Sequence, residues 1–467
     1  MIIFIFFSEV LIRFMGNFCQ KAFAYVFSLS IGTISVGFGL VYFAASYTTI
    51  VDPLILDTSM KQSIFNALTP IGAIFGGPLV NFAIQKFGRK FPTMVSSGFV
   101  ILGGIFIIIT KTSYKELAFV GRAVLGLGVG AVSTVNPVYI AELSPPDVRG
   151  SYGVMSQLFC SIGTLMTYFV SIWVDWRAIS GIMISFPLLS IISIFFIPES
   201  PAFTKMETEN KKKQENIFQK KYSLPLILSF FVVVFQQFSG INALFSNLTV
   251  IFEKSKVTLN SSISSAIVAI AQIIATASST PLVECLGRRK TWMISSIGQA
   301  IFLLILWANE KWNWSTILPV VMLFFDVFLF GIGLGPIPWF VVPELFPDEV
   351  RGLAMGIVQA VNWLLCALMV FIFPTMQENL TLAWTYFFYG VVMVISFLFG
   401  IFALPETKGG EMGVVKKNDN PKSIDTNTSS NLEENFDSSR NSQTSSSELD
   451  SESYSDDSNS EGRIDEV

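Results

Sequence analysis

The sequence predicts an all-α membrane protein with twelve transmembrane helices arranged in two six-helix halves. Three observations lead to this prediction: the composition, the spacing of apolar segments and an internal repeat. Of the 467 residues, 52% are hydrophobic and 14% are charged, and the mean hydropathy is +0.59. A soluble protein carries about 25% charged residues. So few polar groups could not cover the surface of a soluble chain of this length, so we expect the chain to lie in a membrane.

The residue inventory argues against an enzyme. The chain has no His, which excludes imidazole metal sites and Ser-His or Cys-His nucleophile pairs. Its four Cys show no CxxC spacing, so neither a disulfide framework nor a zinc site is indicated. No phosphate-binding loop is visible. We therefore expect no catalytic activity, no metal, no cofactor and no nucleic-acid partner.

Spanning helices need about 20 mostly apolar residues. Twelve segments meet this criterion, and they are listed here in chain order: 22–47, 63–84, 93–110, 116–140, 151–174, 179–197, 224–252, 262–283, 291–307, 316–342, 353–373 and 383–404.

The loops between these segments predict the orientation. Loops on one side carry 14 Lys and Arg residues and loops on the other carry 7. Because basic loops stay in the cytoplasm, both termini are expected there, in a multi-pass protein of the plasma membrane. The predicted parts are an N-terminal half (1–198), a short cytoplasmic loop (199–222), a C-terminal half (223–410) and a tail (411–467).

Three motifs repeat at a nearly constant distance. Gly88-Arg89 after the second segment returns as Gly287-Arg288 after the eighth, 199 residues on. A Glu followed seven residues later by Arg closes the fourth and tenth segments, and the two glutamates are 202 residues apart. A Pro-Glu pair ends the sixth and twelfth segments, 207 residues apart. Parallel repeats of six helices are an arrangement that alternating-access transporters use.

The tail has 14 serines, 14 acidic and 5 basic residues, and almost no large apolar ones. It cannot bury enough surface to fold, so we expect it to be disordered. Serines beside acids, such as Ser453 and Ser458, make a kinase a candidate partner. A purely solvating tail is an equally good interpretation.

These motifs together resemble the sugar porter family of the major facilitator superfamily, which includes the facilitative glucose transporters. The resemblance covers roughly residues 15–410. The elements that carry it are listed here: Gly121-Arg122 with Gly126, Gly128 and Gly130, Pro137–Gly150, PESP at 198–201, Gln236–Asn242, Gly335–Trp339, Asn362-Trp363 and PETKG at 405–409. It implies the major facilitator fold and a small sugar as substrate, with membrane lipid around the helices. The central loop is shorter than is usual in the family, and Gln85 stands where an acid or Asn is usual.

Polar amides inside apolar helices mark the expected binding site. Neutral amides at membrane depth are costly unless they bond across helices or face a wet cavity. Gln236 and Asn242 lie six apart around Gly240, which suits a helix that breaks near its middle. Amides donate and accept, as sugar hydroxyls require, and Trp faces can stack on a pyranose ring. By resemblance, the substrate-binding residues are Gln157, Gln236, Gln237, Asn242, Gln272 and Trp339, and Asn362 and Trp363 line the same cavity. For Gln157 and Gln272, interhelical bonding alone is a serious alternative.

Charges at the cytoplasmic helix ends are the expected gate. Carboxylates stand near arginines there, with Glu142 paired to Arg149 and Glu344 paired to Arg351. An ionic latch of this kind would hold the two halves together and bias a two-state equilibrium. The expected gating residues are Arg89, Arg122, Glu142, Arg149, Glu284, Arg288, Glu344 and Arg351.

The first segment decides the expected driving force. Proton-driven members of the family resemble one another in having an Asp in their first helix. In this chain, residues 34–42 of the first segment contain no acid. Asp326 is expected near the outer interface. We therefore predict a hexose uniporter, with a proton symporter and a non-transporting sugar sensor as alternatives.

Overall fold

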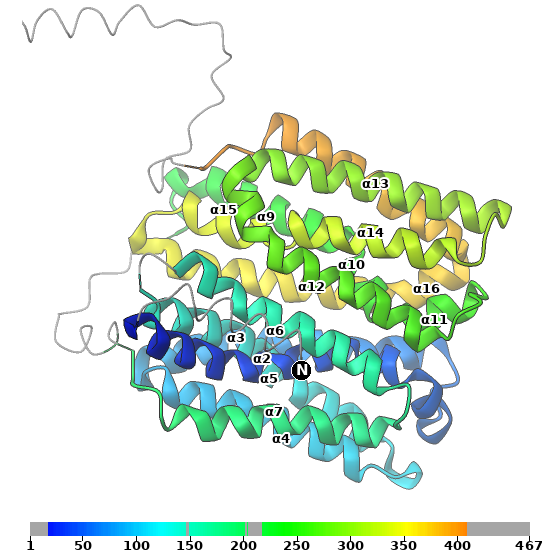
Figure 1. The fold of residues 1–467 in the computed structure, drawn as a ribbon, viewed down its shortest axis with the longest axis horizontal. Helices are drawn as coiled ribbons and strands as arrows, with labels where there is room; N and C mark the ends of the chain where they lie inside the picture. The colour runs from blue at the N-terminus through cyan, green and yellow to red at the C-terminus, as the bar shows by residue number, and fades with distance from the viewer. Residues whose placement is uncertain (1–16, 146–148, 201–202, 204–216, 409–467) are drawn as a thin grey trace, which may run out of the picture. The chain divides into compact units, whose positions relative to one another are not determined.

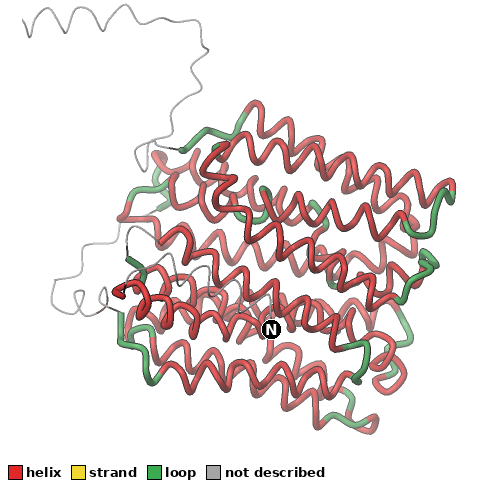
Figure 2. The backbone as a smooth tube through the Cα atoms, in the orientation of Figure 1, coloured by secondary structure: helices red, strands yellow, loops and turns green. Residues whose placement is uncertain are grey.

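The computed structural model describes residues 17–145, 149–200, 203 and 217–408. The described chain is helical and contains no strand (Figure 2). The acidic tail, its serines and most of the central loop lie outside the described residues.

The first half of the chain forms six long helices. These are α2 (Asn17–Leu54), α3 (Ser59–Phe87), α4 (Lys90–Ile109), α5 (Glu116–Leu143), α6 (Arg149–Val170) and α7 (Trp176–Ile194), with the short 3₁₀ turn η1 (Thr112–Tyr114) before α5. Each is long enough and apolar enough to cross a membrane. They agree with the first six predicted segments.

The second half is more interrupted. After the 3₁₀ turn η3 (Lys220–Tyr222), its helices are α9 (Ser223–Phe238), α10 (Ile241–Phe245), α11 (Leu248–Lys254), α12 (Ser261–Leu286), α13 (Arg288–Trp312), α14 (Leu318–Ile332), α15 (Ile337–Leu345) and α16 (Asp348–Phe402). The seventh predicted segment is thus divided among α9, α10 and α11, and the tenth between α14 and α15. The break in the seventh was expected, whereas the break in the tenth was not.

The last helix, α16, contains two spans. It has 55 residues, which at 1.5 Å per residue is about 80 Å, far more than the 30 Å of a hydrocarbon core. Thr381 has φ 67° and ψ 160°, which interrupts the helix between the eleventh and twelfth predicted segments. The described chain therefore contains twelve spans, as the sequence predicted.

The helices run side by side, with α2–α7 grouped together and α9–α16 beside them (Figure 1). One large buried apolar cluster is built mainly from residues 217–404, and another mainly from residues 34–183. The partition is not complete, because Trp363 and Cys366 of α16 belong to the first-half cluster. Between the halves, α16 packs on α3 and α12 packs on α6.

Glycines allow α5 to approach its neighbours closely. A Cβ on Gly126 would lie 2.2 Å from the Thr69 carbonyl oxygen of α3, and one on Gly130 would lie 2.3 Å from that of Ala73. Gly128 faces α4 in the same way. Backbones can approach so closely only where no side chain intervenes, and this explains the glycine spacing seen in the sequence.

Candidate functional site

The centre of the site is the break between α9 and α10. Gly240 has φ +82°, a left-handed conformation that L side chains rarely adopt, and it interrupts the helix after Phe238. A Cβ at this position would lie 2.6 Å from the ring of Tyr389, so the position also requires glycine for space. The break turns Gln237 and Asn242 toward each other.

A row of amide side chains crosses this break. Asn242 Nδ2 donates to Gln237 Oε1 over 2.7 Å, and Gln237 Nε2 donates to Asn362 Oδ1 over 2.6 Å. Gln237 and Asn362 are buried, and Asn242 is half-buried. The row therefore joins α10, α9 and α16 at one point inside the protein.

Gln236 connects this row to the second broken helix. Its Nε2 donates to the carbonyl oxygens of Leu334 (3.1 Å) and Gly335 (2.8 Å), which lie in the gap between α14 and α15. Its Oε1 is buried and has no partner among the described residues. The two helix breaks are thus held together by one amide, which retains a free acceptor.

The remaining expected binding residues are described by their burial rather than by hydrogen bonds to the amide row. Gln272 is half-buried, and its Oε1 has no partner in the described part of the chain. Trp363 is buried and its Nε1 also lacks a partner there. Trp339 is half-buried in α15, while Gln157 is exposed on α6. Buried polar atoms without partners carry a desolvation cost of about 1–3 kcal/mol each, so they are suited to bind a polar ligand.

Two polar residues that the sequence analysis missed also reach between the halves. Asn66 Nδ2 in α3 donates to the Ser246 carbonyl oxygen over 3.1 Å, just after α10. The hydroxyl of Tyr168 in α6 donates to the carbonyl oxygen of Phe245. Asn66 is a polar amide in an apolar helix, which is the criterion that identified the other amides. The same criterion could have identified Asn66 from the sequence.

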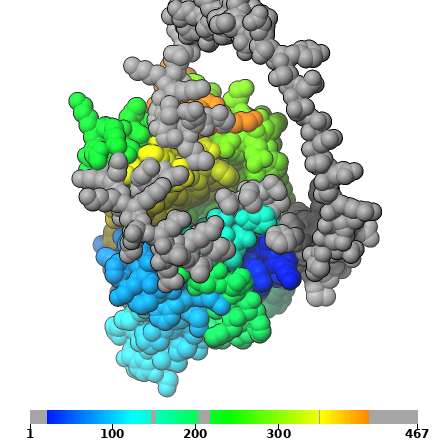
Figure 3. Space-filling model, turned by 90° about the vertical axis from the view of Figure 1, so that its left-hand side faces the viewer, coloured from blue at the N-terminus to red at the C-terminus, as the bar shows by residue number. Residues whose placement is uncertain are grey.

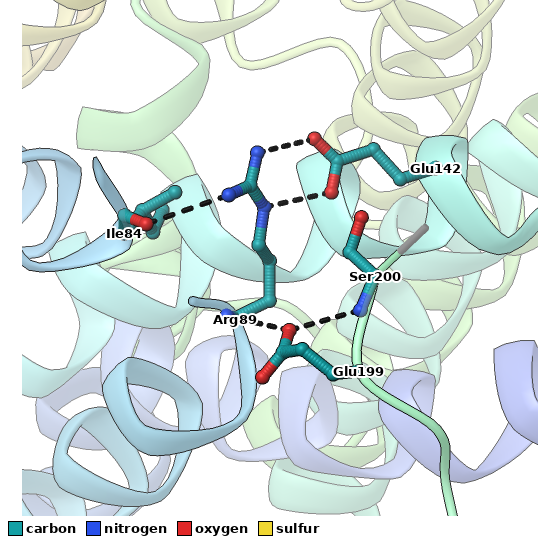
Figure 4. Close-up of polar contacts among 5 residues, drawn as sticks. All are labelled: Ile84, Arg89, Glu142, Glu199 and Ser200. Carbon is teal, nitrogen blue, oxygen red and sulfur yellow. Dashed lines mark hydrogen bonds and ion pairs between the residues drawn. The ribbon is translucent and has the colours of Figure 1, made fainter. Parts of the chain in front are cut away.

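A cluster of charges lies at one end of the first six helices (Figure 4). We call this end, defined by Arg89, Glu142, Arg288 and Glu344, the Arg89 end. Arg89 makes two parallel bonds to Glu142, Nε to Oε2 at 2.7 Å and Nη2 to Oε1 at 2.6 Å. Glu199 accepts the backbone N–H groups of Arg89 (2.8 Å) and Lys90 (3.3 Å), where α4 begins. A carboxylate is favourable at a helix N-terminus, so the three motifs of the first half form one cluster.

The second half repeats this cluster. Arg288 Nη2 donates to Glu344 Oε1 over 2.8 Å, and Thr407 donates to the other Glu344 oxygen. Glu406 accepts the backbone N–H groups of Arg288 (3.0 Å) and Arg289 (3.1 Å) at the start of α13. The sequence repeat is therefore also a repeat of contacts. Figure 3 looks onto the side of the bundle on which α15, the helix carrying Glu344, lies.

The partners of these charges differ from those expected. Glu344 bonds to Arg288 and Thr407, whereas Arg351 donates to the carbonyl oxygens of Pro343 and Phe346. Glu284 is exposed and makes no hydrogen bond or ion pair within the described chain. The side chain of Arg149 lies outside the described residues. Each described pair also joins helices of one half, so neither Arg89–Glu142 nor Arg288–Glu344 forms a latch between the halves in this structure.

Arg122 does not belong to the Arg89 end. It lies 20 residues before Glu142 on α5, which is about 30 Å along a helix. Its side chain is 0% exposed and donates to the carbonyl oxygens of Gly39 (2.9 Å), Phe65 (3.3 Å) and Asn66 (3.3 Å). Its expected place among the cytoplasmic charges is therefore corrected. Main-chain carbonyl oxygens are therefore the hydrogen-bond acceptors of the Arg122 guanidinium.

Asp326 is not interfacial. It is 0% exposed inside α14, and neither carboxylate oxygen has a partner among the described residues. The expectation of an interfacial Asp326 was wrong because hydropathy does not distinguish a residue near a helix end from one turned into the protein.

Known proteins with similar sequences and folds are membrane carriers. The family model described as "Sugar (and other) transporter" matches residues 16–223 and 205–416. "Sugar transporter ERD6-like 6" of Arabidopsis thaliana is 32% identical over 436 residues, covering 83% of this chain and 88% of that protein. "Facilitated trehalose transporter Tret1" of Bombyx mori is 27% identical, covering 82% and 84%. The inward-open structure of the xylose transporter XylE from E. coli has a TM-score of 0.73 at 22% identity, covering 84% of this chain and 98% of that one.

Proposed function

The chain belongs to the sugar transporter family, and we propose that it carries a hexose-like sugar across the plasma membrane by alternating access. The multi-pass membrane fold and the role in sugar transport follow from the family. The hexose class, the membrane and the cytoplasmic position of both termini are our proposals. The excess of Lys and Arg in the loops at the Arg89 end supports that orientation.

The observation that carries the proposal is the amide row Asn242–Gln237–Asn362. An amide donates and accepts, and a sugar hydroxyl does the same, so each amide can bind one or two hydroxyls. Gln236, Gln272 and Trp363 add buried polar atoms without partners in the described chain. Half-buried Trp339 offers an apolar ring face for the sugar ring. Several such contacts within one bundle suit a small polyhydroxylated substrate.

The helix breaks supply a means of movement. Both α9–α10 and α14–α15 are interrupted beside Gln236, and discontinuous helices at the binding site are typical of alternating-access carriers. The charge clusters at the Arg89 end join helices within each half, so they stiffen each half as a body. Opening and closing would then occur at the contacts of α16 with α3 and of α12 with α6.

The driving force depends on Asp326. Uniport was expected because residues 34–42 hold no acid and because Asp326 was placed at the interface. The absence of an acid in residues 34–42 still favours uniport, and Arg122 bonds to carbonyl oxygens rather than to a carboxylate. The interfacial position of Asp326 no longer does, because this residue is buried.

Uptake of radiolabelled sugars into transporter-null cells tests the proposal. We expect saturable uptake of a hexose that unlabelled hexoses inhibit, with vector-only cells as the control. Saturable uptake of trehalose or a pentose with no hexose competition would refute the hexose class while retaining sugar transport. No sugar uptake by protein present at the cell surface would refute the proposed function itself.

A further inference from the structure

Asp326 is a buried acid that the sugar site does not use. The neighbouring residue Phe325 indicates the depth of Asp326 in the bundle. The ring of Phe325 stacks on that of Phe302 in α13, with centroids 5.4 Å apart. Phe325 is exposed, whereas Asp326, the next residue of α14, is 0% exposed and therefore faces the protein interior. Neither carboxylate oxygen has a partner in the described chain.

The two helices that pack most on α14 bring no basic side chain close to this acid within the described chain. The helices that pack most on α14 are α12 and α13. Among the described residues, the charged groups of α12 and α13 are Glu284, Arg288, Arg289, Lys290, Glu310 and Lys311, all near the helix ends. Lys290 is 12 residues from Phe302, about 18 Å along the helix. An isolated carboxylate in such surroundings is very costly, so Asp326 is held as the neutral acid in this conformation.

Tyr386 of α16 and Glu310 of α13 are two further polar residues that the sugar site does not use. The hydroxyl of Tyr386 is buried and has no partner in the described part of the chain. Glu310 is half-buried near the end of α13 opposite the Arg89 end and accepts from Ser255 over 2.6 Å.

The same elements touch the sugar site. Tyr389, one turn after Tyr386, packs its ring against Gly240 at the break beside Gln237 and Asn242. The helix of Asp326 ends at the gap where Gln236 binds the carbonyl oxygens of Leu334 and Gly335. A change in charge at Asp326 would therefore act on the helix that ends at the gap held by Gln236.

We propose that Asp326 is the proton-binding residue of this carrier, linked to the sugar site through the α14–α15 gap at the end of its helix. In loading, an Asp326 carboxylate oxygen takes a proton from water on the outer side, and in unloading the acid returns that proton to water on the cytoplasmic side. This inference rests on the proposed sugar transport and makes it a proton symport rather than a uniport.

The test uses the full chain in proteoliposomes with labelled sugar. Exchange of sugar at equal pH inside and outside tests transport alone. An imposed gradient of one pH unit, acid outside, should then accumulate sugar about tenfold if one proton accompanies each sugar. A protonophore should abolish the accumulation. Addition of sugar to weakly buffered vesicles should also make the medium alkaline.

Variants assign the proton site. Asp326→Asn should keep exchange at equal pH but lose the accumulation and the alkalinisation. Asp52→Asn, at an exposed acid in α2, should behave like the parent. If Asp326→Asn does not fold, the alkalinisation by the parent protein still decides whether a proton accompanies the sugar, and its absence would overturn the proposal.

The outcomes separate the two proposals. Sugar exchange without proton-driven accumulation would overturn the proton site and leave a uniporter. Accumulation that Asp326→Asn retains would overturn the assignment of the residue. Accumulation driven by sodium instead of protons would overturn the proton as ligand. Absence of any sugar exchange would refute the proposed function rather than this inference alone.

Discussion

Gln237 donates from Nε2 to Oδ1 of Asn362 over 2.6 Å, across 125 positions of sequence. This bond joins α9 to the eleventh span and leaves the amide row in one fixed orientation. Because Gln237 Oε1 also accepts from Asn242, the row is already ordered before a ligand arrives. A preordered site loses less entropy on binding.

The first prediction concerns this row. Gln237→Ala should raise the sugar concentration for half-maximal uptake about tenfold or more, because a substrate hydroxyl and Asn362 each lose a partner worth about 1–3 kcal/mol. Concentration-dependent uptake at matched surface expression measures it. Gln85→Ala, at an exposed amide near the Arg89 end, is the control. An unchanged concentration dependence would remove Gln237 from the site.

The second prediction concerns the helix break. Gly240→Ala should lower the thermal stability of the detergent-purified protein, because a left-handed backbone costs an L residue about 1–2 kcal/mol and the new methyl group would collide with Tyr389. Gly153→Ala is the matched control, since no atom lies within 4 Å of its Cβ position. Equal melting temperatures for the two variants would contradict this account of the break.

The third prediction distinguishes two acids at the Arg89 end. Glu344→Lys should strongly reduce transport, because repulsion replaces the 2.8 Å contact with Arg288. It should also alter the accessibility of cysteine probes at the opposite end. Glu284→Lys should transport nearly as well as the parent, since Glu284 is exposed and unpaired in the described chain. Equal defects in both variants would mean that added charge, not the lost contact, is responsible.

The fourth prediction concerns the ion pair in the first half. The side chains of Arg89 and Glu142 are 6% and 18% exposed, so their two-bond contact is poorly screened by water. A double-mutant cycle with Arg89→Ala and Glu142→Ala should give a coupling energy of about 1–3 kcal/mol in thermal stability. Additive effects of the two single changes would show that the contact contributes nothing of its own.

The sequence by itself determined the features that repeat along the chain. Apolar runs of spanning length gave twelve helices, because a helix in a bilayer needs about 20 apolar residues whatever it packs against. The Gly-Arg, Glu and Pro-Glu motifs predicted two repeated halves, and in the structure the same motifs form one charge cluster in each half. The QQ string around Gly240 predicted a broken helix, because glycine tolerates the left-handed conformation that such a break requires.

Tertiary structure alone decided which residues meet and which face inward. Glu344 pairs with Arg288, 56 positions away, rather than with the nearby Arg351. Arg122 lies far from the charges at the Arg89 end, and Asp326 turns into the protein. In water, burial follows hydropathy, but here lipid and protein interior are both apolar. Hydropathy therefore predicts that a segment spans the membrane, while the packing of neighbouring helices decides which face each side chain occupies.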